Sequence, residues 1–188
     1  ESRGLKRGLR PVQEAQQLLQ GGPAAALSFA DLICLAGAYV VEAAGGPSIT
    51  VPLGRVDAAA ADPPGRIPEE TLSGPELRAH FAKSGFTTQE FVALCGAHTL
   101  GSKGFGDPVT FDNTYYKTLL EKPWAAPNMT AEQKAMTSHI GLPSDKALPE
   151  DAECLPYIKL YAQDSRRFYH DFAEAYKKLS VAGTGLVA

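Results

Sequence analysis

The chain of 188 residues has little of several features that mark particular classes of protein. Its three cysteines (Cys34, Cys95 and Cys154) are too few for a disulfide scaffold, although one pair could form. Its 18 Lys and Arg against 21 Asp and Glu give no basic excess, which argues against nucleic acid as a partner. Leu32–Val41 is its best apolar run and has half the roughly 20 residues of a transmembrane helix, so we expect a buried helix and no transmembrane segment.

The N-terminus shows no targeting pattern. The chain begins at Glu1 and not at Met, and no signal or transit peptide is recognisable. The sequence therefore predicts either a processed protein or a missing N-terminal segment.

Helical periodicity dominates the chain, while alternating strand patterns are scarce. Ser28 predicts the N-cap of one helix, with Asp31 at its third position, and Thr87 with Glu90 predicts a capping box for another. The expected helices cover residues 5–20, 29–42, 73–85, 87–97 and 111–120, a short one could begin at 130, and one or two close the chain over 151–154 and 156–180. The sequence predicts a mainly α fold and one domain over residues 1–188.

One histidine, His98, stands at or just past the end of the helix that Thr87 opens. A single histidine there is more often a structural hydrogen-bonding residue than a ligand. A ligating imidazole usually donates its second N–H to a carboxylate, and Asp145 in a Pro-Ser-Asp turn is the candidate. Sequence spacing does not show whether the two meet. A zinc or redox site with Cys95, completed by Cys34 or Cys154, is a weaker alternative.

Several blocks in a fixed order resemble the plant-type haem peroxidases. ALCGAHTLG resembles their proximal-histidine motif, SFADLICLAG and GGPSITVPLGRVDA the segments before it, and PPGRIPEE, TFDNTYY and LPSDKAL further blocks. FYHDFAEAYKKLSVAG resembles the last helix of ascorbate peroxidases. The resemblance covers essentially the whole chain, and the small number of cysteines favours the intracellular, class I branch.

The resemblance implies a haem-peroxidase-like helical fold with haem as its cofactor. His98 then matches the axial iron ligand and Asp145 the carboxylate that orients it. Thr99, Thr110 and Asp112 match positions that hold a monovalent or divalent cation in some relatives. Capping and loop hydrogen bonds are an equally good interpretation of these three residues.

The distal half of such a site is missing from this chain. In the family, a histidine base and an arginine activate peroxide from a helix that lies N-terminal to everything present here. No segment before Ser28 resembles that helix. Arg166 and His170 imitate its motif, but they lie inside the closing helix, where we expect surface residues.

Other departures concern the side of the site where the family binds its reducing substrate. Ascorbate peroxidases carry a basic stretch after the proximal histidine, whereas only Lys103 is found here. Gly106-Asp107-Pro108 replaces their tryptophan beside that histidine, and the only tryptophan, Trp124, comes later. The segment 123–140, with Met129 and Met136, has no close counterpart in the active enzymes, and oxidisable methionine suits a peroxide site poorly.

KGFGDP, FDNTYYKTLLEKPW and IGLPSDKAL with DAECL resemble the ascorbate-peroxidase-like branch of the plant thylakoid lumen. That branch is associated with photosystem II and is regarded as lacking peroxidase activity. The resemblance predicts a degenerate, non-catalytic auxiliary subunit in the chloroplast thylakoid lumen, without haem, which contacts lumenal photosystem II subunits through residues 122–140. The alternative is an active haem peroxidase that reduces hydrogen peroxide, with its distal residues outside this chain.

Overall fold

The computed structural model describes residues 5–101, 103–121, 130–132 and 140–188, and the regular structure in these ranges is helical. This confirms the mainly α prediction. The α-helices are α1 (Lys6–Leu19), α2 (Phe29–Ala43), α3 (Gly74–Lys83), α4 (Thr88–Cys95), α5 (Thr114–Glu121), α7 (Pro143–Ala147), α8 (Leu155–Gln163) and α9 (Ser165–Val181). Short 3-10 turns are η2 (Pro23–Ala26), η3 (Gly96–Thr99) and η4 (Leu148–Glu150).

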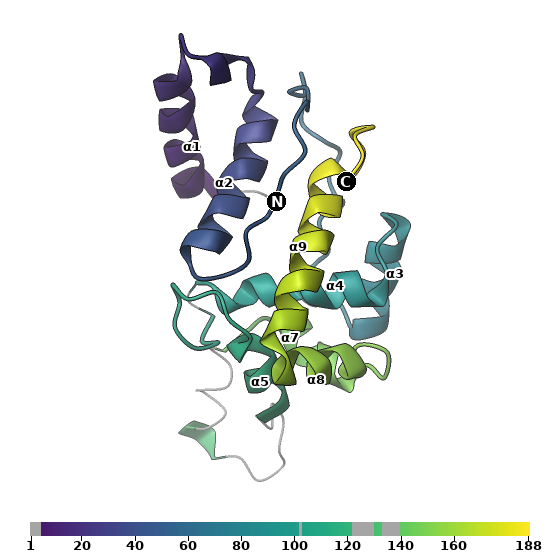
Figure 1. The fold of residues 1–188 in the computed structure, drawn as a ribbon. Helices are drawn as coiled ribbons and strands as arrows, with labels where there is room; N and C mark the ends of the chain where they lie inside the picture. Colours follow the sequence, from purple (N-terminus) through teal and green to yellow (C-terminus); the bar gives the residue numbers. More distant parts are fainter. Residues whose placement is uncertain (1–4, 102, 122–129, 133–139) are drawn as a thin grey trace.

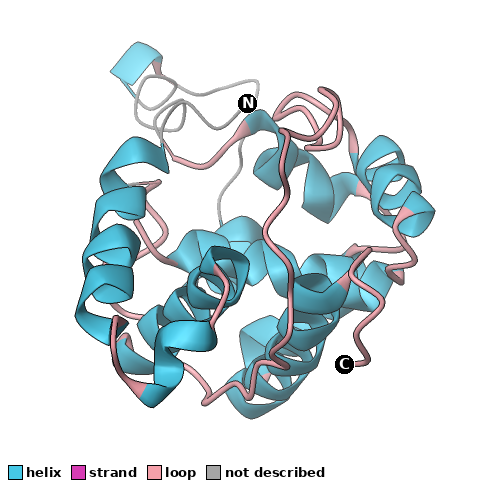
Figure 2. Ribbon diagram, turned by 90° about the horizontal axis from the view of Figure 1, so that it is seen from above, coloured by secondary structure: helices cyan, strands magenta, loops and turns pink. Residues whose placement is uncertain are grey.

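The helices form two groups (Figure 1), and they are joined by loops (Figure 2). α1 and α2 lie side by side at one end, and α9 packs across α4 in the other group, where α5 packs against α8 (Figure 1). The segment between α2 and α3 carries no helix, as the proline- and glycine-rich residues 47–68 predict. The arrangement puts the end of α4 close to the core.

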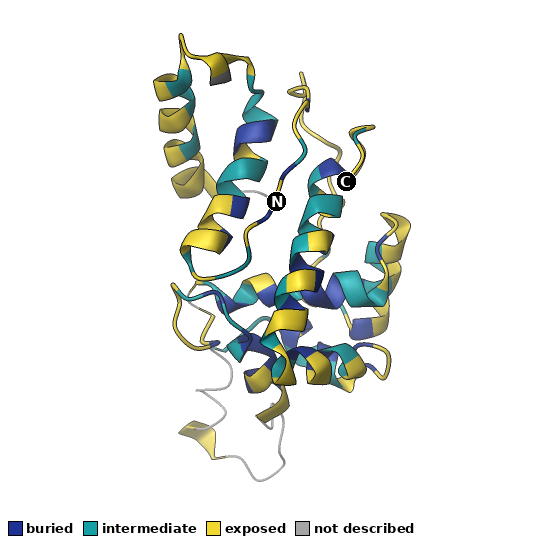
Figure 3. Cartoon of the chain, in the orientation of Figure 1, coloured by how far each residue is buried: buried dark blue, intermediate teal, exposed yellow. Residues whose placement is uncertain are grey.

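The core lies where α4, α5, α8 and α9 meet, and Figure 3 shows the buried residues concentrated there. It is aromatic: Tyr115, Tyr116, Tyr161 and Phe168 are fully buried. Burial of one such side chain contributes about 1.5–3 kcal/mol, so this cluster holds the four helices together. In contrast, α1 has no buried residue.

The predicted caps are confirmed. The Oγ of Ser28 accepts a hydrogen bond of 3.0 Å from the amide of Asp31. At the start of α4, Thr87 Oγ1 accepts from the amide of Glu90 at 3.2 Å, and the Glu90 carboxylate accepts from the amide of Thr87 at 2.8 Å. These side chains satisfy N–H groups that have no partner inside their helices.

Two local predictions need correction. The helix expected from Phe111 begins at Thr114, because the Asp112 carboxylate accepts hydrogen bonds from the amide and the hydroxyl of Thr114 and so caps the helix instead of lying in its first turn. The turn expected at 142–145 carries the short helix α7, while 151–154 remains a turn before α8. The closing region therefore contains two helices, α8 and α9.

Several predictions fall outside the described residues. Trp124, Met129, Met136 and most of the predicted partner segment 122–140 are among them. Arg166 and His170 are exposed on α9, as predicted. In the part of the chain that the structure describes, no helix is long and apolar enough to cross a membrane.

Candidate functional site

His98 lies in η3, the tight turn that continues directly from α4. The turn begins at Gly96, where an added Cβ would collide with the ring of Phe168 and the hydroxyl of Tyr116. Only glycine lets the backbone approach α5 and α9 so closely. This close approach fixes the position of His98 at the edge of the core. The side chain of His98 is 39% exposed.

The structure brings His98 and Asp145 together across 47 residues of sequence. The Nδ1 of His98 lies 2.7 Å from Oδ1 of Asp145, whose side chain is only 2% exposed. The carboxylate is the acceptor, so Nδ1 donates to it and Nε2 is the ring nitrogen left for a ligand. Among the described residues, Nε2 of His98 has no hydrogen-bond partner.

Asp145 accepts two further hydrogen bonds. The hydroxyl of Tyr115 donates to the same Oδ1 at 2.8 Å, and the amide of Leu142 donates to Oδ2 at 2.8 Å. Burial and the charge of Asp145 raise the pKa of Tyr115 well above its usual value, so the phenol stays protonated and donates. Tyr115 belongs to the TFDNTYY block, but the sequence did not predict its contact with Asp145, because no local pattern links the two residues.

A cavity of 280 Å³ opens beside His98. Apolar side chains make up most of its walls: Ile67, Pro68, Leu77, Phe81, Phe91, Leu94, Leu142 and Leu148. Cys95, Ser144, Asp145, Glu69 and Glu70 complete the lining, so two further carboxylates stand at its edge. Four of these residues (Ile67, Pro68, Phe81 and Leu94) also line a larger cavity of 830 Å³, so the two cavities adjoin.

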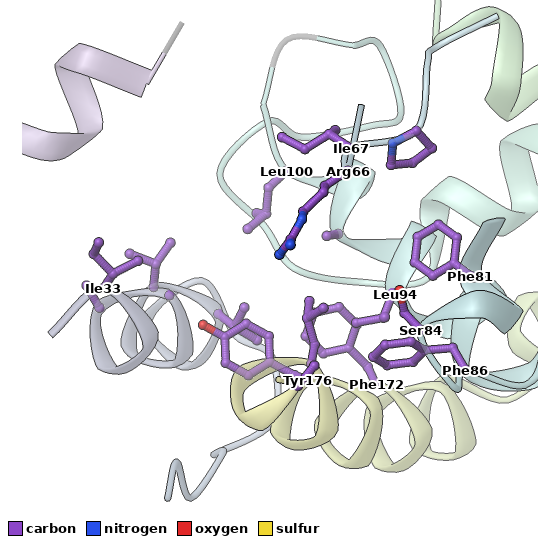
Figure 4. A pocket seen from close by; sticks show the side chains of 18 of the residues that line it. Ile33, Arg66, Ile67, Phe81, Ser84, Phe86, Leu94, Leu100, Phe172 and Tyr176 are labelled. Atoms are coloured by element: carbon purple, nitrogen blue, oxygen red, sulfur yellow. The ribbon is translucent and has the colours of Figure 1, made fainter. Parts of the chain in front are cut away.

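The larger cavity lies between α2 on one side and α3, α4 and α9 on the other (Figure 4). Phe86, Phe172 and Tyr176 give it an aromatic floor, and Arg66 extends into it from the loop before α3 (Figure 4). The lining suits a large apolar ligand that carries an acidic group.

The predicted cation residues make hydrogen bonds among themselves and with their neighbours. Thr99 donates from its hydroxyl to Asp112 at 3.0 Å, so these two residues meet. Thr110 instead donates to Asp107 at 3.0 Å. Thr114 donates twice to Asp112. These hydrogen bonds are the ones that the capping and loop interpretation expects. A cation at Thr99, Thr110 and Asp112 stays a prediction.

The zinc alternative gains no support from the described residues. All three cysteines are free, and no group of three His, Cys, Asp or Glu that could hold a metal occurs in the described part. Cys154 is buried, and burial raises the pKa of its thiol to about 12.

A helical fold with a carboxylate-backed imidazole facing an apolar cavity agrees with the family comparison. The sequence profile of the peroxidase family matches residues 1–107, and the chain belongs to this family. Its relatives place it among the ascorbate-peroxidase-like members of the plant-type, class I haem peroxidases. The family is normally haem-dependent.

Three relatives show the extent of the similarity. The chain is 51% identical over 183 residues to a protein named "Putative L-ascorbate peroxidase 6" of Arabidopsis thaliana, covering 97% of this chain and 53% of the relative. It is 38% identical over 167 residues to the cytosolic L-ascorbate peroxidase 2 of the same plant, covering 84% and 62%. A mitochondrial cytochrome c peroxidase of Cryptococcus neoformans var. grubii is 37% identical over 173 residues, covering 84% and 46%. The chain thus spans about half the length of the relatives it matches.

Proposed function

We propose that this chain forms the proximal half of a haem site, in which His98 binds the iron through Nε2. One observation carries the proposal: Asp145 holds the imidazole through Nδ1, while Nε2 makes no hydrogen bond to the described residues and the ring lines a mostly apolar cavity. If His98 and Asp145 served only to stabilise the fold, the Nε2 of His98 would not need to lie on the wall of a cavity. A haem-dependent peroxidase is the activity that this half-site would serve.

The residues around His98 fit a haem group. The adjoining cavities are mostly apolar and partly aromatic, which suits a porphyrin ring. Arg66 is a cation at the larger cavity that suits the carboxylates of the porphyrin, although it also pairs with Asp62 at 3.2 Å. Haem, when bound, supplies the redox chemistry of peroxide reduction. Asp145 keeps the Nδ1 proton in place, which fixes the ring of His98 and makes Nε2 a stronger donor.

Hemin titration of the full-length protein tests the proposal. We expect a Soret band that His98→Ala abolishes and an affinity that Asp145→Asn lowers about 10- to 100-fold, the usual cost of losing an outer-shell partner. His170→Ala is the matched control, because it removes an exposed histidine of α9 and should leave the band unchanged. A wild-type protein without a Soret band, or a band that persists in His98→Ala, contradicts the proposal.

As an alternative to peroxidase activity, we propose a non-catalytic auxiliary subunit of photosystem II in the chloroplast thylakoid lumen. It is supported by the resemblance of KGFGDP and LLEKPW to that branch and by the loop after His98. In this loop the amide of Gly101 donates to the carbonyl of Pro108 at 2.8 Å, and the amide of Gly141, which precedes α7, donates to the carbonyl of Lys103 at 2.7 Å. Lys103 is its one basic residue, which is a poor cradle for an ascorbate anion.

Two measurements separate this second proposal from an active ascorbate peroxidase. The full-length protein should co-fractionate with photosystem II membranes, and deletion of residues 125–138 should release it. With hemin added, the protein should oxidise ascorbate with hydrogen peroxide no faster than free hemin does. Enzymatic turnover of ascorbate argues against a non-catalytic role, and unchanged membrane retention of the deletion variant rejects the partner segment.

A further inference from the structure

We infer that Tyr115 is a positioning residue for the iron ligand: its phenolic O–H shares Asp145 Oδ1 with His98 and so limits how strongly this carboxylate polarises the imidazole. The inference rests on the proposed haem site, because it concerns the donor strength of His98 toward iron. It concerns Tyr115, a residue of the core that lines neither of the two adjoining cavities.

The geometry at Asp145 explains why the two donors compete. Oδ2 is held by the Leu142 amide, which fixes the carboxylate at the start of α7. Oδ1 accepts from His98 Nδ1 at 2.7 Å and from the Tyr115 hydroxyl at 2.8 Å. A carboxylate oxygen offers two lone pairs, so these donors fill it. Each donor takes part of the negative charge, and a bond from Tyr115 therefore leaves less for His98.

Packing holds Tyr115 in this position. Its side chain has no exposed surface, and its ring meets Phe105 edge-on at 4.7 Å and Tyr116 at 5.0 Å between centroids. The ring also faces His98 edge-on at 5.9 Å. The phenol therefore stays beside the pair as a permanent donor instead of exchanging with water.

The neighbouring residue supplies a matched control. Tyr116 is also fully buried on α5, but its hydroxyl donates to the carbonyls of Val92 and Ala93 and not to Asp145. Tyr115→Phe and Tyr116→Phe remove the same atom from the same core. A role in stability alone would be shared by both tyrosines, whereas an effect on His98 belongs only to Tyr115.

The test uses the full-length protein, first without haem and then with hemin. Without haem, Tyr115→Phe should shift the ring ¹⁵N resonances of His98 toward a stronger Nδ1–H bond. With hemin, the same variant should have a lower reduction potential of the haem iron. At a fixed potential the ratio of ferric to ferrous haem should rise about tenfold, which is the scale of one hydrogen bond to a charged group. Tyr116→Phe should change neither quantity.

Replacing Tyr115 with a fluorotyrosine keeps the ring and makes the hydroxyl a stronger donor, so both quantities should shift the opposite way. This variant also covers the case in which Tyr115→Phe does not fold. Equal shifts in the Tyr115 and Tyr116 variants, or no shift at His98, overturn the inference. If the wild type binds no haem, the proposed site fails, while the nitrogen resonances of His98 still decide the role of Tyr115.

Discussion

At the scale of single residues, a buried ion pair stabilises the fold. Asp31 and Arg55 form an ion pair of 2.7 Å with side chains that are 3% and 4% exposed. The amides of Gly54 and Arg55 also donate to Asp31, and Arg55 donates to the carbonyl of Ser180. The pair therefore ties α2 to the end of α9 and to the segment that follows α2.

The Asp31 carboxyl predicts acid sensitivity. Burial by itself raises the pKa of Asp31, but hydrogen bonds from Gly54 and Arg55 outweigh it and hold the pKa below its usual value. A depressed pKa stabilises the fold above the unfolded value of about 3.9, and this contribution is lost as the pH falls through the folded pKa.

Asp31→Asn leaves Arg55 buried without a counter-charge and should cost about 3–5 kcal/mol at neutral pH. Urea unfolding at several pH values checks this. The difference between wild type and variant should shrink below about pH 3.9, because protonated Asp31 resembles asparagine. A difference that is constant down to pH 2 contradicts the assignment.

Gly96 provides a packing test. Gly96→Ala places a methyl group against Phe168 and Tyr116, and overpacking of this kind costs about 1–3 kcal/mol. Gly8→Ala on the exposed helix α1 is the control: nothing lies within 4 Å of its added Cβ, so it should stabilise by up to about 1 kcal/mol. Thermal unfolding of both variants measures the contrast, and a neutral Gly96→Ala would show that η3 can move away.

At the scale of elements, α4 is short but anchored at both ends. Its N-terminus is closed by the box of Thr87 and Glu90, and Glu90 also forms an ion pair with Lys178 of α9 at 2.7 Å. Its C-terminus continues into the turn that carries His98. The position of the candidate ligand therefore depends on how well this one helix is held.

Thr87→Ala should destabilise the protein by about 1 kcal/mol, because the amide of Glu90 loses its acceptor. Thr87→Ser restores the oxygen and should recover most of the loss. Thr88→Ala, the same change one residue further along, caps no amide and serves as the control. Denaturant midpoints compare the three variants, and an equal loss in Thr87→Ala and Thr88→Ala would rule out capping as the cause.

At the scale of the whole molecule, the two groups of helices differ in how much they bury. α4, α5, α8 and α9 share the aromatic core, whereas α1 buries none of its residues and packs on α2 (Figure 3). Local stability follows the number of buried apolar contacts. The part of the chain with the candidate site is therefore the stable part.

Amide hydrogen exchange of this 188-residue chain should show the difference directly. Amides of α1 should exchange orders of magnitude faster than those of α9, whose Phe168, Phe172 and Ala175 are buried. The C-terminal half of α2, around the buried Val41, should fall between them. Equal protection of α1 and α9 would mean that the two groups unfold as one unit.

Much of the local structure follows from the sequence. The caps at Ser28 and Thr87 and the periodicity of the apolar residues predict the helices to within a few residues, and they place His98 just after α4. The start of α5 was predicted too early, because the side chain of Asp112 replaces a helical hydrogen bond. Periodicity does not report this competition between side chain and backbone.

The sequence by itself determined the helical class, the family and the choice of His98 and Asp145 as the candidate ligand and its carboxylate partner. Caps, periodicity and motif order suffice for this, because they are local signals. Only the tertiary structure decided that these two residues touch, that Tyr115 shares the same carboxylate oxygen, and that the imidazole opens on an apolar cavity. The physical reason is distance along the chain: the contacts join η3, α5 and α7, and packing of the aromatic core alone sets their separation in space.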